Sequence, residues 1–263
     1  MRPKALVLHA AGINRDVDAA YAMEMAGADV RIIHVNELKA SRRALADSAI
    51  LVVPGGFSYA DALGAGRLFA LDIASFFKEE VAEFVERGKP VIGICNGFQT
   101  LVKAGILPGL GIPSLKADER YTTLTENLNR RFECRWVTMK AERGPCLWTR
   151  DIDEPIVCPI AHGEGRFVTK DRSQLKAIVA ADLVAFRYAL PDGEPADGRY
   201  PDNPNGSMAD IAGICNPAGN VLGLMPHPEN NIFSGPGSRA YRGGKPGGGL
   251  GIFINGVRYA NQM

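Results

Sequence analysis

Residues 90–102 read PVIGICNGFQTLV, and they predict both the fold of this chain and the place of its chemistry. The apolar run at 90–94 is typical of a strand buried on both faces of a parallel sheet, and from Asn96 onward the apolar residues recur at helical spacing. Cys95 stands between strand and helix, with a glycine two positions away on either side. This G-x-C-x-G pattern is the thiol version of a nucleophile elbow, a tight strand-to-helix turn that exposes one side chain.

The tetrapeptide GICN occurs again at residues 213–216, so the sequence offers two candidate thiols. Cys95 precedes a predicted helix, whose N-terminal dipole lowers the pKa of a thiol and raises its thiolate fraction. Cys215 is followed by Pro217 and turn-forming residues, so no helix points at its sulfur, and we expect a structural cysteine at a strand end. The elbow pattern alone leaves Cys95 open between a nucleophile and a buried cysteine beside a tight turn.

The segment MPHPEN at residues 225–230 supplies what a nucleophilic cysteine needs. A thiol requires a base, and the base requires a group that holds its ring. The prolines around His227 exclude a helix and favour extended backbone, in which residues two apart point to the same side. Glu229 is then placed to hold one imidazole nitrogen while the other faces the thiol. Alone, the segment is also consistent with a solvated proline-rich loop, and its combination with the elbow favours a catalytic site.

Apolar runs alternate with helical patterns on both sides of this elbow. The runs that predict buried strands are 4–9, 30–35, 49–53 and 90–94. Helical patterns are present at 14–26 and in one long helix whose apolar face runs from Ile73 to Val85. Strands that are apolar on both faces and separated by helices indicate an α/β fold, with a mostly parallel sheet and helices on both faces. Ligands of such sheets bind at the carboxyl ends of the strands, where Cys95 lies.

The second half of the chain has shorter apolar runs and more turns. Strands are expected at 132–139, 156–160 and 177–188, and a hairpin at 210–215 and 221–225. Residues 191–206 are polar and turn-forming, and residues 234–250 are rich in glycine and predict a surface loop. We find no convincing linker, so we expect a single domain over residues 1–263 that ends in a glycine-rich loop or tail at about 231–263.

Composition excludes several classes of function. The 30 lysines and arginines nearly cancel the 29 aspartates and glutamates, which leaves no positive field for nucleic acid or for an anionic membrane. No apolar run is long enough to span a bilayer and no secretory leader is present, so we expect a cytoplasmic protein. The five cysteines form no C-x-x-C pair, which argues against a disulfide framework and a zinc knuckle. No three potential ligands have metal-binding spacing, so no metal site is predicted.

A second glycine-rich turn, PGGF at residues 54–57, follows another predicted strand. It therefore lies at the same edge of the sheet as Cys95. Glycines there allow backbone N–H groups to approach a ligand, so Gly56 and Phe57 are candidate donors to an oxyanion. The backbone N–H of Asn96, directly after the nucleophile, is the other candidate. Taken alone, the PGGF turn is equally consistent with an ordinary connection between a strand and a helix.

Together these motifs resemble those of class I (triad) glutamine amidotransferases. The PGGF turn, the elbow cysteine with a glutamine four residues later at Gln99, and the H-P-E near the end occur in the order typical of that class. Within the class the chain is similar to the family of glutaminase subunits of phosphoribosylformylglycinamidine synthase, which belong to purine biosynthesis. The segments that carry this similarity are VPGGFSYAD (53–61), GICNGFQTLVKAGILPG (93–109), PIAHGEGRF (159–167), NPNGS (203–207) and IAGICNPAGNVLGLMPHPE (211–229).

The resemblance implies a flavodoxin-like α/β fold and an enzyme that hydrolyses glutamine to glutamate and ammonia. On those terms Cys95 is the nucleophile and forms a γ-glutamyl thioester. His227 is the general base and acid, and Glu229 orients it.

The resemblance also implies where substrate and partners meet the chain. Gln99 would contact the amino-acid end of glutamine, together with the loop formed by His162, Gly163 and Glu164. The ammonia would pass to a large ATP-dependent synthetase subunit that converts formylglycinamide ribonucleotide to formylglycinamidine ribonucleotide, usually with a small third subunit. No cofactor is expected in this chain, because ATP and Mg²⁺ are used by the partner synthetase.

Several features depart from the family pattern, among them the segment 12–16 and the long glycine-rich tail beyond residue 230, and two other functions compete with this one. Ala60 stands where the family often has glycine, and residues 63–67 (LGAGR) differ from the commoner sequence, although neither belongs to the expected triad. The first competing function is a free-standing cysteine hydrolase or peptidase of the same fold, which the specific motifs disfavour. The second is a non-catalytic partner-binding module, which the intact triad disfavours.

Overall fold

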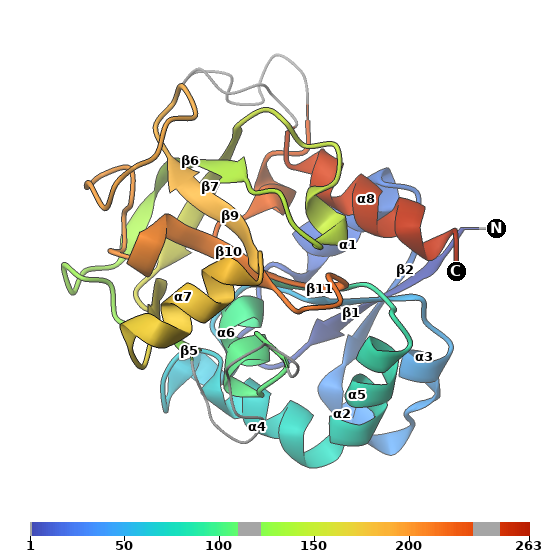
Figure 1. The fold of residues 1–263 in the computed structure, drawn as a ribbon. Coiled ribbons are helices and arrows are strands. Elements are labelled where there is room, and N and C mark those ends of the chain that lie inside the picture. Colours follow the sequence, from blue (N-terminus) through green and yellow to red (C-terminus); the bar gives the residue numbers. More distant parts are fainter. Residues whose placement is uncertain (1, 110–121, 234–247) are drawn as a thin grey trace.

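The computed structural model describes residues 2–109, 122–233 and 248–263, and Figure 1 shows their arrangement. In this part of the chain a nine-stranded sheet has the order β2-β1-β3-β4-β11-β10-β9-β6-β7, and β5 and β8 form a separate pair. The strands are β1 (Lys4–His9), β2 (Asp29–His34), β3 (Ile50–Val53), β4 (Val91–Ile94), β5 (Thr122–Thr125), β6 (Glu133–Ala141), β7 (Ile156–His162), β8 (Arg166–Thr169), β9 (Val184–Ala189), β10 (Ile211–Cys215) and β11 (Val221–Leu224).

The sheet has a parallel half and an antiparallel half. Strands β2, β1, β3, β4 and β11 pair in parallel, in the order typical of flavodoxin-like folds. From β11 outward, β10, β9, β6 and β7 pair antiparallel, and β10 with β11 forms the predicted hairpin. The predicted α/β class and parallel sheet are therefore confirmed. Because β3 and β4 are parallel neighbours, the turns that follow them meet at one edge of the sheet.

Helices cover both faces of the parallel half (Figure 1). On one face lie α1 (Asp16–Met25) and α8 (Leu250–Ala260), and on the other α4 (Arg67–Phe76), α5 (Lys78–Glu86) and α6 (Asn96–Lys103). The shorter elements are α2 (Val35–Ala40), α3 (Arg43–Ala46), α7 (Arg172–Ala180), η1 (Ser58–Asp61), η2 (Leu147–Thr149), η3 (Met208–Asp210) and η4 (Pro228–Asn230). Every residue of β3 and β4 is buried, which explains why their sequences are apolar on both faces.

The single long helix expected around residues 73–85 is wrong, because the chain forms two helices, α4 and α5, that break at Phe77. Phe77 has φ −132°, and it ends the first helix and begins the second. Its ring is 1% exposed, so the apolar spacing continues through the break. Ile73, Val81 and Phe84 are buried as one helix would bury them, which is why spacing alone did not reveal the break, whereas Phe76 is exposed.

The strand expected at 177–188 is also wrong in its first part. Residues 172–180 form α7, and only 184–189 form β9. The Asp171 carboxylate caps the helix by accepting from the backbone N–H of Ser173 and Gln174, and the Gln174 side chain accepts from the N–H of Lys170. The helix start was readable in the sequence as an N-cap aspartate followed three positions later by glutamine.

The expected loop or tail at about 231–263 contains a helix that the sequence analysis missed. The most glycine-rich part, 234–247, lies outside the described residues, but α8 packs against α1 and η2. Asn255 donates its side-chain amide to the backbone oxygens of Trp148 and Arg150. A Cβ on Gly256 would lie 2.1 Å from the Trp148 ring, so glycine here permits close packing. Among the described helices, none is long and apolar enough to cross a bilayer.

Candidate active site

Cys95 occupies a strained elbow between β4 and α6, as predicted. Its backbone has φ 50° and ψ −105°, a conformation that non-glycine residues adopt rarely and that is common at functional sites. A Cβ on Gly97 would lie 1.8 Å from the backbone oxygen of Val53, and one on Gly93 would lie 2.5 Å from the Leu101 side chain. Both glycines are therefore required by the close approach of neighbouring chain. The elbow places the cysteine at the N-terminus of α6.

His227 and Glu229 form a buried pair across one proline. The Nδ1 atom of His227 lies 2.6 Å from Oε1 of Glu229, and both residues are about 4% exposed. The His227 backbone N–H donates to Pro159 O at 2.9 Å, which anchors the segment to β7. Gly55 lies against the imidazole, because a Cβ there would come 2.8 Å from Cε1. The carboxylate therefore holds the ring from one side and the PGGF turn confines it from another.

The electrostatics of His227 join it to both other members of the predicted triad. Burial by itself lowers the pKa of His227, but the Glu229 carboxylate and the Cys95 side chain outweigh it and raise the pKa to about 10. Within the described chain, Nε2 of His227 is buried and has no hydrogen-bond partner, and Cys95 is among the groups close enough to raise the pKa of the ring. The imidazole of His227 therefore keeps its proton at neutral pH, the state in which it can act as a general acid.

The second GICN cysteine has different surroundings. Cys215 is fully buried at the end of β10, and its thiol contacts that of Cys146. This contact and burial raise the pKa of Cys215 far above its ordinary value. A thiol that cannot ionise is a poor nucleophile. Cys215 is therefore a packing residue, as the sequence analysis expected.

The structure reduces the predicted oxyanion donors from three to two. The backbone N–H of Phe57 donates to Gly12 O at 2.9 Å and is not free to bind a ligand, contrary to the prediction. Gly56 has φ 145°, and a Cβ there would lie 2.7 Å from Cα of Ile13, so only glycine fits this turn. Asn96 is the first residue of α6, where a backbone N–H has no intrahelical acceptor. Gly56 and Asn96 remain as the candidates.

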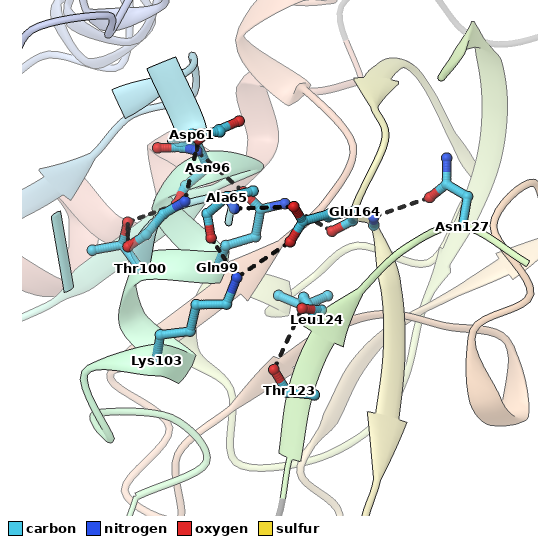
Figure 2. A network of polar contacts seen from close by, with 12 residues as sticks. Asp61, Ala65, Asn96, Gln99, Thr100, Lys103, Thr123, Leu124, Asn127 and Glu164 are labelled. Atoms are coloured by element: carbon cyan, nitrogen blue, oxygen red, sulfur yellow. Dashed lines mark hydrogen bonds and ion pairs between the residues drawn. The ribbon is translucent and has the colours of Figure 1, made fainter. Parts of the chain in front are cut away.

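The Asn96 side chain ties the elbow to the turn that carries Gly56. Its Oδ1 accepts from the backbone N–H of Ser58 at 3.4 Å, and its Nδ2 donates to Asp61 at 3.0 Å and to Gln99 at 3.2 Å (Figure 2). The sequence analysis missed the part played by Asp61. It also missed that residues 59–61 all have positive φ, because no glycine marks that segment.

The residues expected to bind the amino-acid end of glutamine bond to one another. Gln99 donates its side-chain amide to Glu164 O at 2.7 Å, and the Glu164 carboxylate accepts from the Ala65 N–H at 3.1 Å and lies 3.4 Å from Lys103 (Figure 2). Gln99 is 3% exposed. These contacts hold the loop after β7 against α6. Contact of Gln99 and Glu164 with substrate stays a prediction.

His162 and Gly163 belong to the same loop. His162 is buried at the end of β7, with Nδ1 at 3.1 Å from Oδ1 of Asn127. Gly163 accepts the backbone N–H of Asn127 through its carbonyl oxygen at 2.8 Å, and its own contact with substrate stays a prediction. Asn127 was missed by the sequence analysis, because it lies 35 positions away in a segment without any motif. Among the described residues, no three His, Cys, Asp or Glu side chains are grouped as ligands for a metal ion.

The fold and the site together define a class of protein. A thiol at an elbow between a parallel strand and a helix, beside a histidine held by a carboxylate, is the catalytic arrangement of triad hydrolases and amidotransferases. Residues 2–260 match the family described as CobB/CobQ-like glutamine amidotransferase domain. The chain belongs to this family of glutamine amidotransferases and, within it, to the family of phosphoribosylformylglycinamidine synthase subunit PurQ.

Its similarity to individual PurQ subunits covers most of each chain. It is 58% identical to that of Treponema denticola over 88% of this chain and 89% of the relative. It is 41% identical to the PurQ subunit of Dehalococcoides mccartyi over 99% of this chain and 98% of the relative. Among solved structures, that of PurLQS from Thermotoga maritima matches with a TM-score of 0.72 and 33% identity, over 98% of this chain and 99% of the other. A glutamine amidotransferase from Thermotoga maritima, at 14% identity and a TM-score of 0.52 over 87% of this chain and 77% of the other, shares the fold.

Proposed function

We propose that this chain is the glutaminase subunit of a phosphoribosylformylglycinamidine synthase. The observation that carries the proposal is the buried pair of His227 and Glu229, 2.6 Å apart, whose imidazole interacts with the elbow thiol of Cys95. The identity with PurQ subunits over most of the chain supports the particular synthase.

The reaction follows from the charges at the site. Because the imidazole of His227 holds the proton, the Cys95 sulfur attacks the γ-carboxamide carbon of glutamine as a thiolate. As the carbon–nitrogen bond breaks, the nitrogen takes the proton from His227 and leaves as ammonia, and a γ-glutamyl thioester remains. Water, deprotonated by the now neutral His227, then attacks the thioester and releases glutamate and the thiolate. Glu229 keeps the ring oriented in both steps.

Negative charge develops on the carbonyl oxygen in each tetrahedral intermediate. The N–H groups of Asn96 and Gly56 are the donors that this structure leaves available to stabilise it. The positive end of the α6 dipole adds to this stabilisation, since Asn96 is its first residue.

The ammonia is useful only where an activated acceptor is present. The name of the Thermotoga maritima structure, PurLQS, describes an assembly of several subunits. We infer that this chain delivers ammonia to a large synthetase subunit, with a small third subunit in the complex. On this proposal the synthetase uses ATP and Mg²⁺, this chain requires no cofactor of its own, and the complex works in the cytoplasm.

The test is transfer of labelled nitrogen in the reconstituted complex. With amide-¹⁵N glutamine, ATP, Mg²⁺ and formylglycinamide ribonucleotide, the amidine product should carry ¹⁵N. The chain alone should hydrolyse glutamine at about one tenth of the rate of the complex, or more slowly still. A complex with Cys95→Ala should make product only from added ammonium salt. If the isolated chain already works at the full rate and the synthetase changes nothing, the free-standing hydrolase is the correct function.

A further inference from the structure

The site contains a second buried histidine that the mechanism above does not use. His162 is 3% exposed at the end of β7. Its Nδ1 lies 3.1 Å from Oδ1 of Asn127. Its Nε2 is buried and has no hydrogen-bond partner among the described residues. A buried polar nitrogen without a partner is costly, so it calls for a function.

Asn127 determines which nitrogen of His162 carries the proton. The Nδ2 of Asn127 donates to the backbone oxygens of Arg131 at 2.8 Å and of His162 at 2.9 Å. Its Oδ1 accepts from the backbone N–H of Gly165 at 3.0 Å. These contacts exclude the flipped amide, since a flip would point the amide nitrogen at an N–H and its oxygen at two carbonyls. Nδ1 of His162 must therefore donate to Oδ1, which leaves Nε2 of the neutral ring as an acceptor.

The surroundings keep this ring neutral and fixed. Burial and the positive charge of His227 lower the pKa of His162 to about 3. The ring packs on Gly165, because a Cβ there would lie 2.2 Å from Cε1 of His162. At neutral pH the site therefore contains a rigid acceptor with no charge.

This acceptor belongs to the strand that runs along the triad. Ala161, the residue before His162, has its backbone oxygen 3.8 Å from Sγ of Cys95. Pro159, three residues before His162, accepts the backbone N–H of His227. His162 is also close enough to His227 for the charge of one to affect the other. In the proposed reaction His227 protonates the leaving nitrogen of the amide, so an acceptor close to His227 is also close to that nitrogen.

We propose that Nε2 of His162 accepts a hydrogen bond from the carboxamide N–H of glutamine and thereby makes the site specific for a γ-amide. The inference rests on the proposed function. An amide nitrogen carries N–H groups, whereas an ester oxygen carries none. His162 takes up no proton in this role. It orients the nitrogen so that the lone pair released from the amide, as the carbon–nitrogen bond breaks, points at the proton on His227.

Two matched variants separate this role from a structural one. His162→Asn retains an amide nitrogen that can replace Nδ1 toward Asn127 but has no atom at the place of Nε2. His162→Gln places an amide oxygen near Nε2 and restores an acceptor. Each variant is assayed in the complex with its synthetase and small subunit, using glutamine and the γ-methyl ester of glutamate. The ester keeps the α-ammonium and the scissile carbonyl and replaces the NH2 group with a methoxy group, which has no N–H.

We expect His162→Asn to lower kcat/KM for glutamine about ten-fold or more, the loss of one hydrogen bond to a buried acceptor, while ester hydrolysis changes by less than about three-fold. His162→Gln should recover most of the glutamine activity. Equal losses on amide and ester, or a Gln variant no better than the Asn variant, would overturn the role of His162. If the wild-type complex hydrolyses ester but not glutamine, or neither, the proposed function itself fails and this inference fails with it.

A second measurement keeps His162 unchanged, so its result does not depend on whether the His162 variants fold. Nitrogen NMR of histidine-labelled Cys95→Ala protein should show Nδ1 protonated and Nε2 unprotonated. Saturating glutamine should shift the Nε2 resonance in the direction of hydrogen-bond acceptance, and the γ-methyl ester should not. A protonated Nε2, or the same shift with both ligands, would contradict the proposal.

Discussion

The Nδ1 atom of His227 lies 2.6 Å from Oε1 of Glu229, although a single proline separates the two residues. The extended backbone predicted for this segment is wrong, because Pro228 begins the 3₁₀ helix η4 and His227 is its N-cap residue. Glu229 lies within this short helix, next to the imidazole that it contacts. One short segment thus contains both the proposed base and the group proposed to orient it.

Replacing Glu229 should cost less than replacing His227. Glu229→Gln removes a negative charge that raises the pKa of His227 against the lowering effect of burial. The pKa of His227 should therefore fall, and the ring should lose its fixed orientation. We expect the kcat of Glu229→Gln to be about 10²-fold to 10⁴-fold below that of the wild type, and the kcat of His227→Ala to be lower still. Steady-state glutamine hydrolysis in the complex measures both. Unchanged turnover in Glu229→Gln would refute the role of the carboxylate.

Cys95 should be the only thiol that reacts with an electrophilic glutamine analogue. A diazo-ketone analogue should label the protein once, and peptide mass spectrometry should place the label on Cys95. Cys95→Ala should abolish labelling and glutaminase activity. Cys215→Ala is the matched control from the second GICN, and it should leave both close to wild type, because that thiol is buried against Cys146. A label on Cys215 would contradict the assignment.

The low pKa of His162 should make stability depend on acid pH. The folded protein holds this pKa at about 3 against an ordinary 6.5, so the unfolded chain binds the proton first as pH falls. The stability that neutral His162 gives the folded protein is fully present above pH 6.5 and is lost as the pH falls toward about 3. Over that range the free energy of unfolding changes by at most about 1.4 kcal/mol per pH unit. Urea unfolding of wild type and His162→Asn should therefore converge in free energy as the pH is lowered. Parallel curves would show that His162 titrates normally.

Gly97 should tolerate no side chain, whereas Gly105 should. A Cβ on Gly97 would lie 1.8 Å from Val53 O, which is backbone and cannot turn aside, so Gly97→Ala should destabilise the fold by about 3 kcal/mol or more and misplace the elbow. Gly105 has φ 79° and nothing within 4 Å of the added Cβ, so Gly105→Ala should cost about 1–2 kcal/mol, the cost of a left-handed residue. Urea unfolding measures both. Equal losses of unfolding free energy in the two variants would mean that the close approach of Val53 O to Gly97 does not exclude a side chain there.

Sequence reasoning predicted the parallel half of the sheet because its strands are buried on both faces and therefore read as continuous apolar runs. It failed where two structures share one pattern. Ile73, Phe77 and Phe84 are buried on both sides of the break at Phe77, so their helical spacing did not reveal it. The helix α8 was missed because its helical pattern follows a glycine-rich stretch that suggested a loop up to the end of the chain.

The sequence by itself predicted the nucleophile, the base and the orienting carboxylate, because each prediction depends on a few adjacent residues: glycines around Cys95 and prolines around His227. Only the tertiary structure decided which backbone groups remain free and how the second histidine is protonated. The Phe57 N–H is taken by Gly12, and the tautomer of His162 is set by Asn127, 35 positions away. The physical reason is that a hydrogen-bonding group is committed by whatever partner the fold brings to it, and such partners leave no local pattern in the chain.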